Sequence, residues 1–229
     1  MRAAVIIPTL NEADNLIDLI GQLRSNQDIS KIVIVDDGSQ DGTIESIKTL
    51  AGTCGDLVLI QRSKPMGIGS AIREGLRKAL EIPDIQRYVQ MDADLSHDPR
   101  DATKLLGMEA DMIIGSRYIT GATTGERSRF RWMISLTANS LARSFLGIDV
   151  SDSTSGFRSY NERVARLLSE RTSSDGRSFQ VEATWLVLKE GLSVKEVPIR
   201  FEDRKRGRSK LDPIKEPFAL LLFLLKHRA

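Results

Sequence analysis

The chain has 229 residues, of which 41% are hydrophobic and 28% are charged, a composition typical of a folded domain large enough to bury its own core. Disordered, collagen-like and disulfide-stapled classes are excluded, since the single cysteine, Cys54, cannot form an internal disulfide and indicates a reducing compartment. Residues 1–110 carry 12 Lys and Arg against 17 Asp and Glu, a net charge of −5, whereas residues 111–229 carry 21 against 14, a net charge of +7. The two halves are therefore expected to meet different partners, although uneven surface charge explains the asymmetry equally well.

Five short apolar runs in the first half have the continuity of buried parallel strands. They cover residues 3–7, 31–35, 57–60, 88–91 and 112–114, and the first is expected to end at Pro8. Apolar residues recur at helical spacing between them, within 16–23, 44–50 and 72–80. This alternation predicts an α/β fold with a Rossmann-like, mostly parallel sheet and helices on both faces. Asn11 is expected to cap the first helix and Asp41 the second.

The second half is less regular. Residues 119–129 are predicted as a polar loop, 130–145 as a helix and 151–160 as a turn-rich segment. Helices near 163–169 and 181–190 precede an edge strand over 193–198, a basic loop over 204–210 and a last helix that begins at Pro213. We therefore predict a single domain over residues 1–229 with a helical extension in its second half.

Polar segments follow four of the predicted strands, at the sheet edge where open parallel sheets bind their ligands. These segments are residues 8–12, 36–43, 92–94 and 115–117, and three of them contain carboxylates. Asn and Asp also cap helices and form turns, but acidic groups gathered at one edge repel one another unless a ligand or a cation lies between them. Asp92 and Asp94 supply the oxygen ligands that Mg²⁺ or Mn²⁺ prefers, and a diphosphate would approach through such an ion.

These segments and others after them form eight motifs in a fixed order that covers nearly the whole chain. They are Pro-Thr-Leu-Asn-Glu (8–12), Val-Asp-Asp-Gly-Ser-Gln-Asp-Gly-Thr (35–43), Met-Asp-Ala-Asp-Leu-Ser-His-Asp-Pro (91–99), Gly-Ser-Arg-Tyr (115–118), Ser-Gly-Phe-Arg-Ser-Tyr (155–160), Phe-Gln-Val-Glu (179–182), Glu-Val-Pro-Ile-Arg-Phe (196–201) and the spaced residues Arg204, Gly207, Ser209 and Lys210. The set resembles the inverting nucleotide-sugar glycosyltransferases of the GT-A fold, family 2, and within them the dolichol-phosphate (polyprenyl-phosphate) mannosyltransferases.

The resemblance implies an enzyme that moves mannose from GDP-mannose to dolichyl or polyprenyl phosphate with the help of Mg²⁺ or Mn²⁺. It divides the chain into a nucleotide-sugar-binding half (1–116), an acceptor-binding half (117–212) and a C-terminal helix (213–229). The same reaction with UDP-glucose or another donor stays open, as does a non-catalytic nucleotide-sugar or membrane-binding module. No nucleic acid partner is expected.

The resemblance also implies roles for individual residues. The nucleoside and donor are assigned to Pro8, Asn11, Glu12, Asp36, Asp37, Asp92, Ala93 and Asp94. Asp92 and Asp94 would hold the metal, with Ser96 standing where many relatives carry a Gln. Arg117 is predicted to be catalytic with the two aspartates, and it joins Arg131, Arg200 and Lys210 as acceptor-phosphate ligands, because arginine forks suit phosphate groups.

Two further expectations concern the chemistry and the surroundings of the site. A lipid phosphate has a second pKa near ~6, so its attacking oxygen needs no general base, and Glu182, the nearest candidate base, is expected to fix a sugar hydroxyl or a loop arginine. Arg204 and its basic neighbours are expected to be solvated. The apolar run 218–225 is too short to cross a bilayer and predicts either an interfacial helix or one packed on this protein or a membrane subunit. The enzyme is thus expected at the cytoplasmic face of a membrane.

Overall fold

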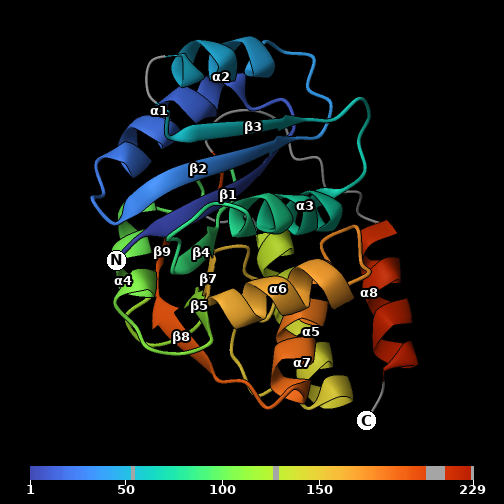
Figure 1. Cartoon of the computed structure of the whole chain (residues 1–229). Coiled ribbons are helices and arrows are strands. Elements are labelled where there is room, and N and C mark those ends of the chain that lie inside the picture. Colours follow the sequence, from blue (N-terminus) through green and yellow to red (C-terminus); the bar gives the residue numbers. More distant parts are fainter. Residues whose placement is uncertain (53–54, 126–128, 205–214, 228–229) are drawn as a thin grey trace.

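The computed structural model describes residues 1–52, 55–125, 129–204 and 215–227, and for residues 129–131 the backbone alone. Cys54, Lys210 and the side chain of Arg131, all three singled out in the sequence, lie outside the described part. In Figure 1 the N-terminal strands and helices occupy the upper part of the view, and the C-terminal helix α8 (Lys215–Lys226) lies at the right-hand edge.

A seven-stranded sheet with the strand order β3-β2-β1-β4-β7-β5-β8 forms the centre of the fold (Figure 1). Its strands are β1 (Ala3–Thr9), β2 (Ile29–Asp36), β3 (Leu57–Gln61), β4 (Arg87–Gln90), β5 (Met112–Ser116), β7 (Arg158–Tyr160) and β8 (Val194–Pro198). All pairings are parallel except those of β7, which runs antiparallel between β4 and β5. The predicted α/β fold with a mostly parallel sheet is confirmed, and strands from both sides of residue 116 share this sheet.

Helices cover both faces of the sheet and bury two apolar clusters against it. Their bounds are α1 (Ala13–Arg24), α2 (Thr43–Ala51), α3 (Ile68–Leu80), α4 (Ala102–Leu106), α5 (Arg129–Leu146), α6 (Glu162–Arg171) and α7 (Phe179–Lys189). Helices α1, α2 and α4 pack on one face, and α3, α5, α6, α7 and α8 contribute to the cluster on the other. Successive side chains of a strand point to opposite faces of the sheet. In strand β1, Val5 and Ile7 therefore pack on the face covered by α1, α2 and α4, whereas Ala4 and Ile6 pack on the opposite face.

Two local predictions around the first strand and the first helix are wrong. Strand β1 does not end at Pro8 but continues to Thr9, because its pairing with β4 ends at Ile6 and the missing N–H of Pro8 is not required on that side. Asn11 does not cap α1: the N-cap is Glu12, and Asn11 adopts a φ of 50° and accepts a hydrogen bond from the backbone N–H of Gln40 at 2.8 Å.

Asp41 is not the N-cap of α2, which is Gly42 with a φ of 89°, but it lies directly before that residue at the start of the helix. Its carboxylate accepts a hydrogen bond from the N–H of Thr43, the first residue of α2, at 3.1 Å. The other oxygen of the same group accepts from the N–H of Ala13 at 3.2 Å, so one side chain joins the starts of α1 and α2 beside the sheet edge.

The largest difference from the sequence prediction is β7, which lies in the segment expected to be turn-rich. Its side chains are buried although the sequence is Arg-Ser-Tyr, because each polar group is satisfied inside the fold. Arg158 donates to the carbonyl oxygens of Ser153 and Ser155, both at 2.7 Å, and Tyr160 donates to Gln90 at 2.7 Å. Burial raises the pKa of Tyr160 to about 12.

A second, two-stranded parallel sheet, formed by β6 (Thr123–Thr124) and β9 (Arg200–Phe201), was also not predicted from the sequence.

Candidate active site

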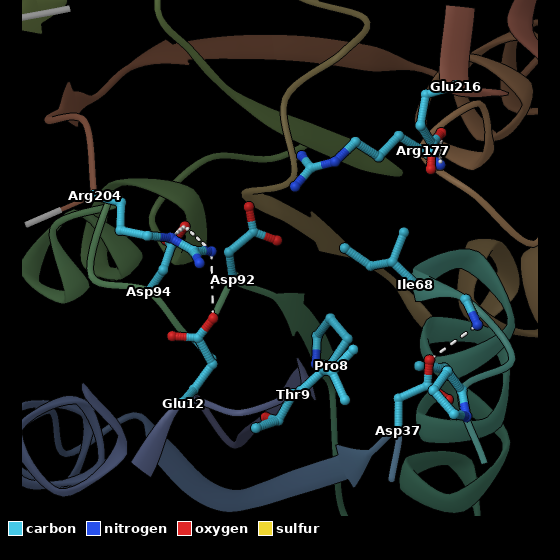
Figure 2. Close-up of a pocket in the computed structure, with 15 residues that line it drawn as sticks. Pro8, Thr9, Glu12, Asp37, Ile68, Asp92, Asp94, Arg177, Arg204 and Glu216 are labelled. Carbon is cyan, nitrogen blue, oxygen red and sulfur yellow. Dashed lines mark hydrogen bonds and ion pairs between the residues drawn. The ribbon is translucent and has the colours of Figure 1, made fainter. Parts of the chain in front are cut away.

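A cavity of about 260 Å³ opens at the carboxyl ends of β1, β2 and β4. Figure 2 shows Pro8, Thr9 and Asp37 at one end of this cavity and Arg177 with Glu216 at the other. The lining residues are Pro8, Thr9, Leu10, Glu12, Asp37, Pro65, Gly67, Ile68, Ala71, Asp92, Ala93, Asp94, Arg177, Arg204 and Glu216. The fold therefore brings together six of the predicted donor-site residues, namely Pro8, Glu12, Asp37, Asp92, Ala93 and Asp94.

Asp92 and Asp94 enter the cavity just after strand β4. The Oδ1 atom of Asp92 is buried and has no hydrogen-bond partner within the described part of the chain. Gly156 lies against it, and a Cβ atom at that position would stand 3.0 Å from the same oxygen. A buried carboxylate oxygen without a partner is costly unless a cation or a donor joins it. The pair consequently fits the hard divalent cation that the sequence suggests.

The donor set also limits the kind of metal site. Among the described residues there is no group of three Asp, Glu, His or Cys side chains arranged around one metal position. Mg²⁺ in phosphate-binding sites commonly uses one or two carboxylates, with water and phosphate oxygens as the remaining ligands. Asp92 and Asp94 thus suit an ion that shares its coordination with a bound diphosphate, and do not suit a permanently caged structural metal.

Arg204 lies between two of the acidic side chains (Figure 2). Its Nη2 atom is 2.9 Å from Asp94 Oδ2 and 3.3 Å from Glu12 Oε1, and its Nε atom is 3.1 Å from Asp94 Oδ2. The Arg204 side chain is only 14% exposed, so its expected solvated position is wrong. Burial raises the pKa of Asp94, but the hydrogen bond from Ser96 and the charge of Arg204 hold it below the usual value. Asp94 is therefore ionised at neutral pH and already holds one cation.

The two aspartates that follow β2 are engaged by the protein itself. Asp36 is fully buried and accepts hydrogen bonds from the backbone N–H groups of residues 38–39 at 3.1 and 2.9 Å. Asp37 accepts from the N–H groups of residues 66–67 at 2.8 and 2.9 Å and pairs with Arg62 at 3.1 Å. Asp36 does not line the cavity, whereas Asp37 forms part of its wall. Both carboxylates thus order the backbone around this end of the cavity, and their predicted contact with a nucleoside stays a prediction.

Asn11 and Ser96 lie beside the cavity rather than in its lining. Asn11 is exposed and joins α1 to the loop before α2 through Ser39 and Gln40. Ser96 is buried, and its backbone N–H donates to Asp94 Oδ1 at 3.1 Å. Ser96 therefore orients the Asp94 carboxylate, and a direct contact of its hydroxyl with a metal remains a prediction.

The two predicted acceptor arginines whose side chains the structure describes, Arg117 and Arg200, do not line the cavity. Arg117 lies in a nearly buried ion pair in which its Nε and Nη2 atoms each stand 2.7 Å from an oxygen of Asp152. Arg200 is largely exposed and pairs with Asp98 at 3.1 Å. Asp152 itself is held by Glu196, which accepts hydrogen bonds from the N–H groups of Ser151 and Asp152 at 2.8 and 3.0 Å.

Glu182 is buried and anchors the loop between α6 and α7. Its carboxylate accepts from the N–H of Ser173 at 2.9 Å, the hydroxyl of Ser173 at 3.0 Å and the N–H of Ser174 at 2.8 Å. It does not line the cavity. Among the described residues, the carboxylate of Glu182 thus binds the loop backbone and one serine hydroxyl, and its predicted contact with a sugar hydroxyl stays a prediction.

The sequence analysis missed two charged residues of the cavity lining, Arg177 in this loop and Glu216 on α8. Arg177 extends into the cavity, and the N–H of Arg177 donates to Glu216 Oε2 of α8 at 2.8 Å (Figure 2). Neither residue stands in a spacing that points to chemistry. The only signal for Arg177 is the excess of positive charge in the second half of the chain, which does not distinguish it from the other cations there.

Comparison with known proteins shows the family to which the chain belongs. Residues 4–168 match the model of the glycosyl transferase family 2 domain. The chain is 37% identical over 219 residues to polyprenol monophosphomannose synthase of Mycolicibacterium smegmatis, an alignment that covers 92% of this chain and 81% of that protein. It is 36% identical over 214 residues to undecaprenyl-phosphate mannosyltransferase of Micrococcus luteus, with 92% and 88% covered.

Solved structures with the same fold include glucosyl-3-phosphoglycerate synthase from Mycobacterium tuberculosis. Its complex with phosphoglyceric acid superposes with a TM-score of 0.71 at 15% identity and covers 99% of this chain and 80% of that one. A complex of the same enzyme with Mn²⁺, UDP and glucosyl-3-phosphoglycerate superposes with a TM-score of 0.70 at 17% identity, with the same coverage. At this level of identity the likeness concerns the fold.

Proposed function

Because the chain belongs to glycosyl transferase family 2, we propose that it transfers mannose from GDP-mannose to a polyprenyl phosphate with inversion at the anomeric carbon. Support for the mannosyl group and the lipid acceptor comes from the two relatives at 36% and 37% identity, which are named for these substrates. The observation that carries the proposal is the cavity at the strand ends, which Asp92 and Asp94 both line, and in which a buried oxygen of Asp92 has no hydrogen-bond partner among the described residues.

Each end of the cavity has a distinct task in this proposal. Pro8, Thr9 and Asp37 form the wall against which the nucleoside lies, and Asp92 with Asp94 holds the divalent ion beside the diphosphate. A bound Mg²⁺ or Mn²⁺ ion acts as a Lewis acid that stabilises the leaving diphosphate. Arg204, already 2.9 Å from Asp94, adds a positive charge at the same place.

The part of the site that binds the acceptor phosphate needs positive charge to hold that group, and it needs no general base. The second ionisation of a phosphate monoester lies near pH ~6, so its attacking oxygen is anionic at neutral pH. The position of Glu182, whose carboxylate is committed to the loop of Ser173 and Ser174, supports a mechanism without a carboxylate base. Asp152 holds Arg117 in one orientation, and we retain Arg117 as a proposed ligand of the acceptor phosphate.

A donor and acceptor panel tests the proposal. With purified protein, polyprenyl phosphate and Mg²⁺ or Mn²⁺, we expect GDP-mannose to give mannosylated lipid and UDP-glucose to give at least tenfold less product. A preference for UDP-glucose would replace the proposed donor. Binding of a nucleotide sugar without turnover on any phosphate acceptor would instead support a non-catalytic module.

Helix α8 presents an apolar face away from the fold. Phe218, Leu221, Leu222 and Leu225 are between 42% and 60% exposed, while Phe223 and Leu224 of the same helix are buried against the core. Within the described residues, no helix combines the length and the hydropathy that crossing a bilayer requires. We propose that this face lies in the headgroup layer at the cytoplasmic side of a membrane, where the lipid acceptor is found.

The double substitution Leu222→Gln and Leu225→Gln is expected to lower binding to anionic lipid vesicles about tenfold or more, since each leucine contributes roughly 1.5–3 kcal/mol when fully buried. Co-sedimentation with vesicles measures the effect. Ile17→Gln on α1 is the matched control, because Ile17 is 54% exposed and lies on a different helix. Equal vesicle binding by the double variant and the control would show that the face of α8 does not meet the membrane.

A further inference from the structure

Arg177, in the loop between α6 and α7, lines the cavity at the end away from Pro8 and Asp37. Its side chain reaches across the cavity so that the guanidinium group points toward Asp92 (Figure 2). Within the described part of the chain no carboxylate pairs with this guanidinium, whereas the other arginine in the lining, Arg204, is bound to Asp94 and Glu12. Arg177 is therefore the lining cation that is available to a new anion.

The backbone around Arg177 is held rigidly from three sides. The N–H of Gly69 donates to the carbonyl oxygen of Asp175 at 2.7 Å, and Arg73 donates to the carbonyl oxygen of Ser174 at 2.7 Å. A Cβ atom at Gly69 would stand 2.2 Å from the oxygen of Ser174, so this close approach requires glycine. The carboxylate of Glu182 accepts hydrogen bonds from the backbone N–H groups of Ser173 and Ser174 at the start of the loop. A long side chain on such a fixed backbone loses less freedom when it binds an anion.

The remaining contact joins this loop to helix α8. Glu216, in the first turn of α8, accepts the N–H of Arg177 at 2.8 Å, and its carboxylate lies so close to Gly176 that a Cβ atom there would stand 2.9 Å away. The exposed apolar residues of α8 begin two positions later, at Phe218. The residue whose side chain enters the cavity is thus bonded through its backbone to the helix that carries the exposed apolar face.

We infer that Arg177 binds the phosphate group of the acceptor, and that Glu216 positions it there so that a lipid chain can run from this phosphate along the apolar face of α8. The inference rests on the proposed function and extends it to a residue outside the predicted acceptor set. A phosphate monoester with a long apolar chain matches both features, since an arginine fork binds phosphate and the leucine-rich face accepts hydrocarbon. The nucleotide end of the cavity lies on the opposite side, at Pro8 and Asp37 (Figure 2).

Steady-state kinetics of Arg177→Gln test this assignment. We expect the KM for polyprenyl phosphate to rise about ten- to a hundredfold, the range for losing a hydrogen bond to a charged group, while the Kd of GDP stays within about twofold. Arg177→Lys retains the charge and should fall between the wild type and the glutamine variant. Arg166→Gln is the matched control, because Arg166 is exposed on α6, lies outside the cavity lining and pairs with Glu162, one turn away on the same helix.

Glu216→Ala tests the positioning role. It should raise the KM for polyprenyl phosphate by a smaller factor and leave the Kd of GDP unchanged. In the double variant it should add nothing to Arg177→Gln, because both changes act on the same proposed contact between the Arg177 guanidinium and the acceptor phosphate. The opposite pattern, with the GDP Kd raised and the acceptor KM unchanged, would assign Arg177 to the donor. Faster sugar transfer to 3-phosphoglycerate than to polyprenyl phosphate would contradict the proposed position of a lipid chain along α8.

The proposed function and the assignment of Arg177 can be disproved separately. If the wild type transfers no sugar to polyprenyl phosphate, the proposed function is wrong. If the wild type transfers and Arg177→Gln has the KM of Arg166→Gln, the function stands and the inference about Arg177 is wrong.

Discussion

Asp94→Asn is expected to reduce sugar transfer by roughly 10²–10³-fold or more, because it removes a charge from the proposed metal site, and such an ion supplies several kcal/mol of transition-state stabilisation. The substitution preserves the shape of the side chain, so the cavity should persist. Mn²⁺ binding, followed by titration calorimetry, should weaken in parallel, which gives a measurement that does not depend on turnover.

Asp18→Asn provides the control for this change, since Asp18 is an exposed carboxylate on α1 outside the cavity lining. Thermal unfolding of both variants checks that the fold is intact. Asp94 also holds Arg204 at 2.9 Å, so the variant frees that arginine as well. Turnover and Mn²⁺ affinity in Asp94→Asn equal to those of the control would remove Asp94 from the metal site.

Asp152→Asn is expected to lower the free energy of unfolding by about 3–5 kcal/mol, the usual cost of leaving one partner of a buried ion pair without the other. Asp152 is fully buried, and its partner Arg117 is only 11% exposed. Glu162→Gln, which breaks the exposed pair with Arg166, should cost less than about 1 kcal/mol. Urea unfolding at pH 7 measures both, and equal losses in the two variants would contradict the structural role of Asp152.

The same pair has a predicted pH dependence. Burial raises the pKa of Asp152, but the charge of Arg117 and its hydrogen bonds outweigh this and hold the pKa below its usual value. A folded-state pKa below the unfolded value of about 3.9 gives stability that is complete above that pH and is lost as the pH falls through the folded pKa. The difference in unfolding free energy between the wild type and Asp152→Asn should therefore be constant from pH 5 to 7 and shrink in more acidic solution.

The first half of the fold was predictable because its physics is local. Parallel strands buried on both faces require continuous apolar runs, and the helices that cover them require apolar spacing near 3.6 residues. Strands β1 to β5 and helices α1 to α3 carry these patterns, and the strand-end rule then places Glu12, Asp37, Asp92 and Asp94 around one cavity.

Strand β7 was missed because its burial does not rest on apolar residues. Arg158 occupies the centre of the sheet with its guanidinium bound to carbonyl oxygens of Ser153 and Ser155 and to the hydroxyl of Thr184. Burial lowers the pKa of Arg158, because the charged form loses its contact with water. The two serines lie close to Arg158 in sequence, but Thr184 lies 26 positions away from it on α7, and no local pattern shows that these groups will surround a buried arginine.

The sequence by itself determined the fold class, the edge of the sheet at which the site forms and the acidic residues placed there, since each follows from patterns within a few neighbouring positions. Only the tertiary structure decided which arginines enter the cavity. Arg204 and Arg177 reach it, Arg117 is committed to Asp152, and Arg200 pairs outside with Asp98. A long charged side chain has the same sequence signature in solvent, in a buried pair or in a binding site, and its position depends on where distant loops cross the sheet edge.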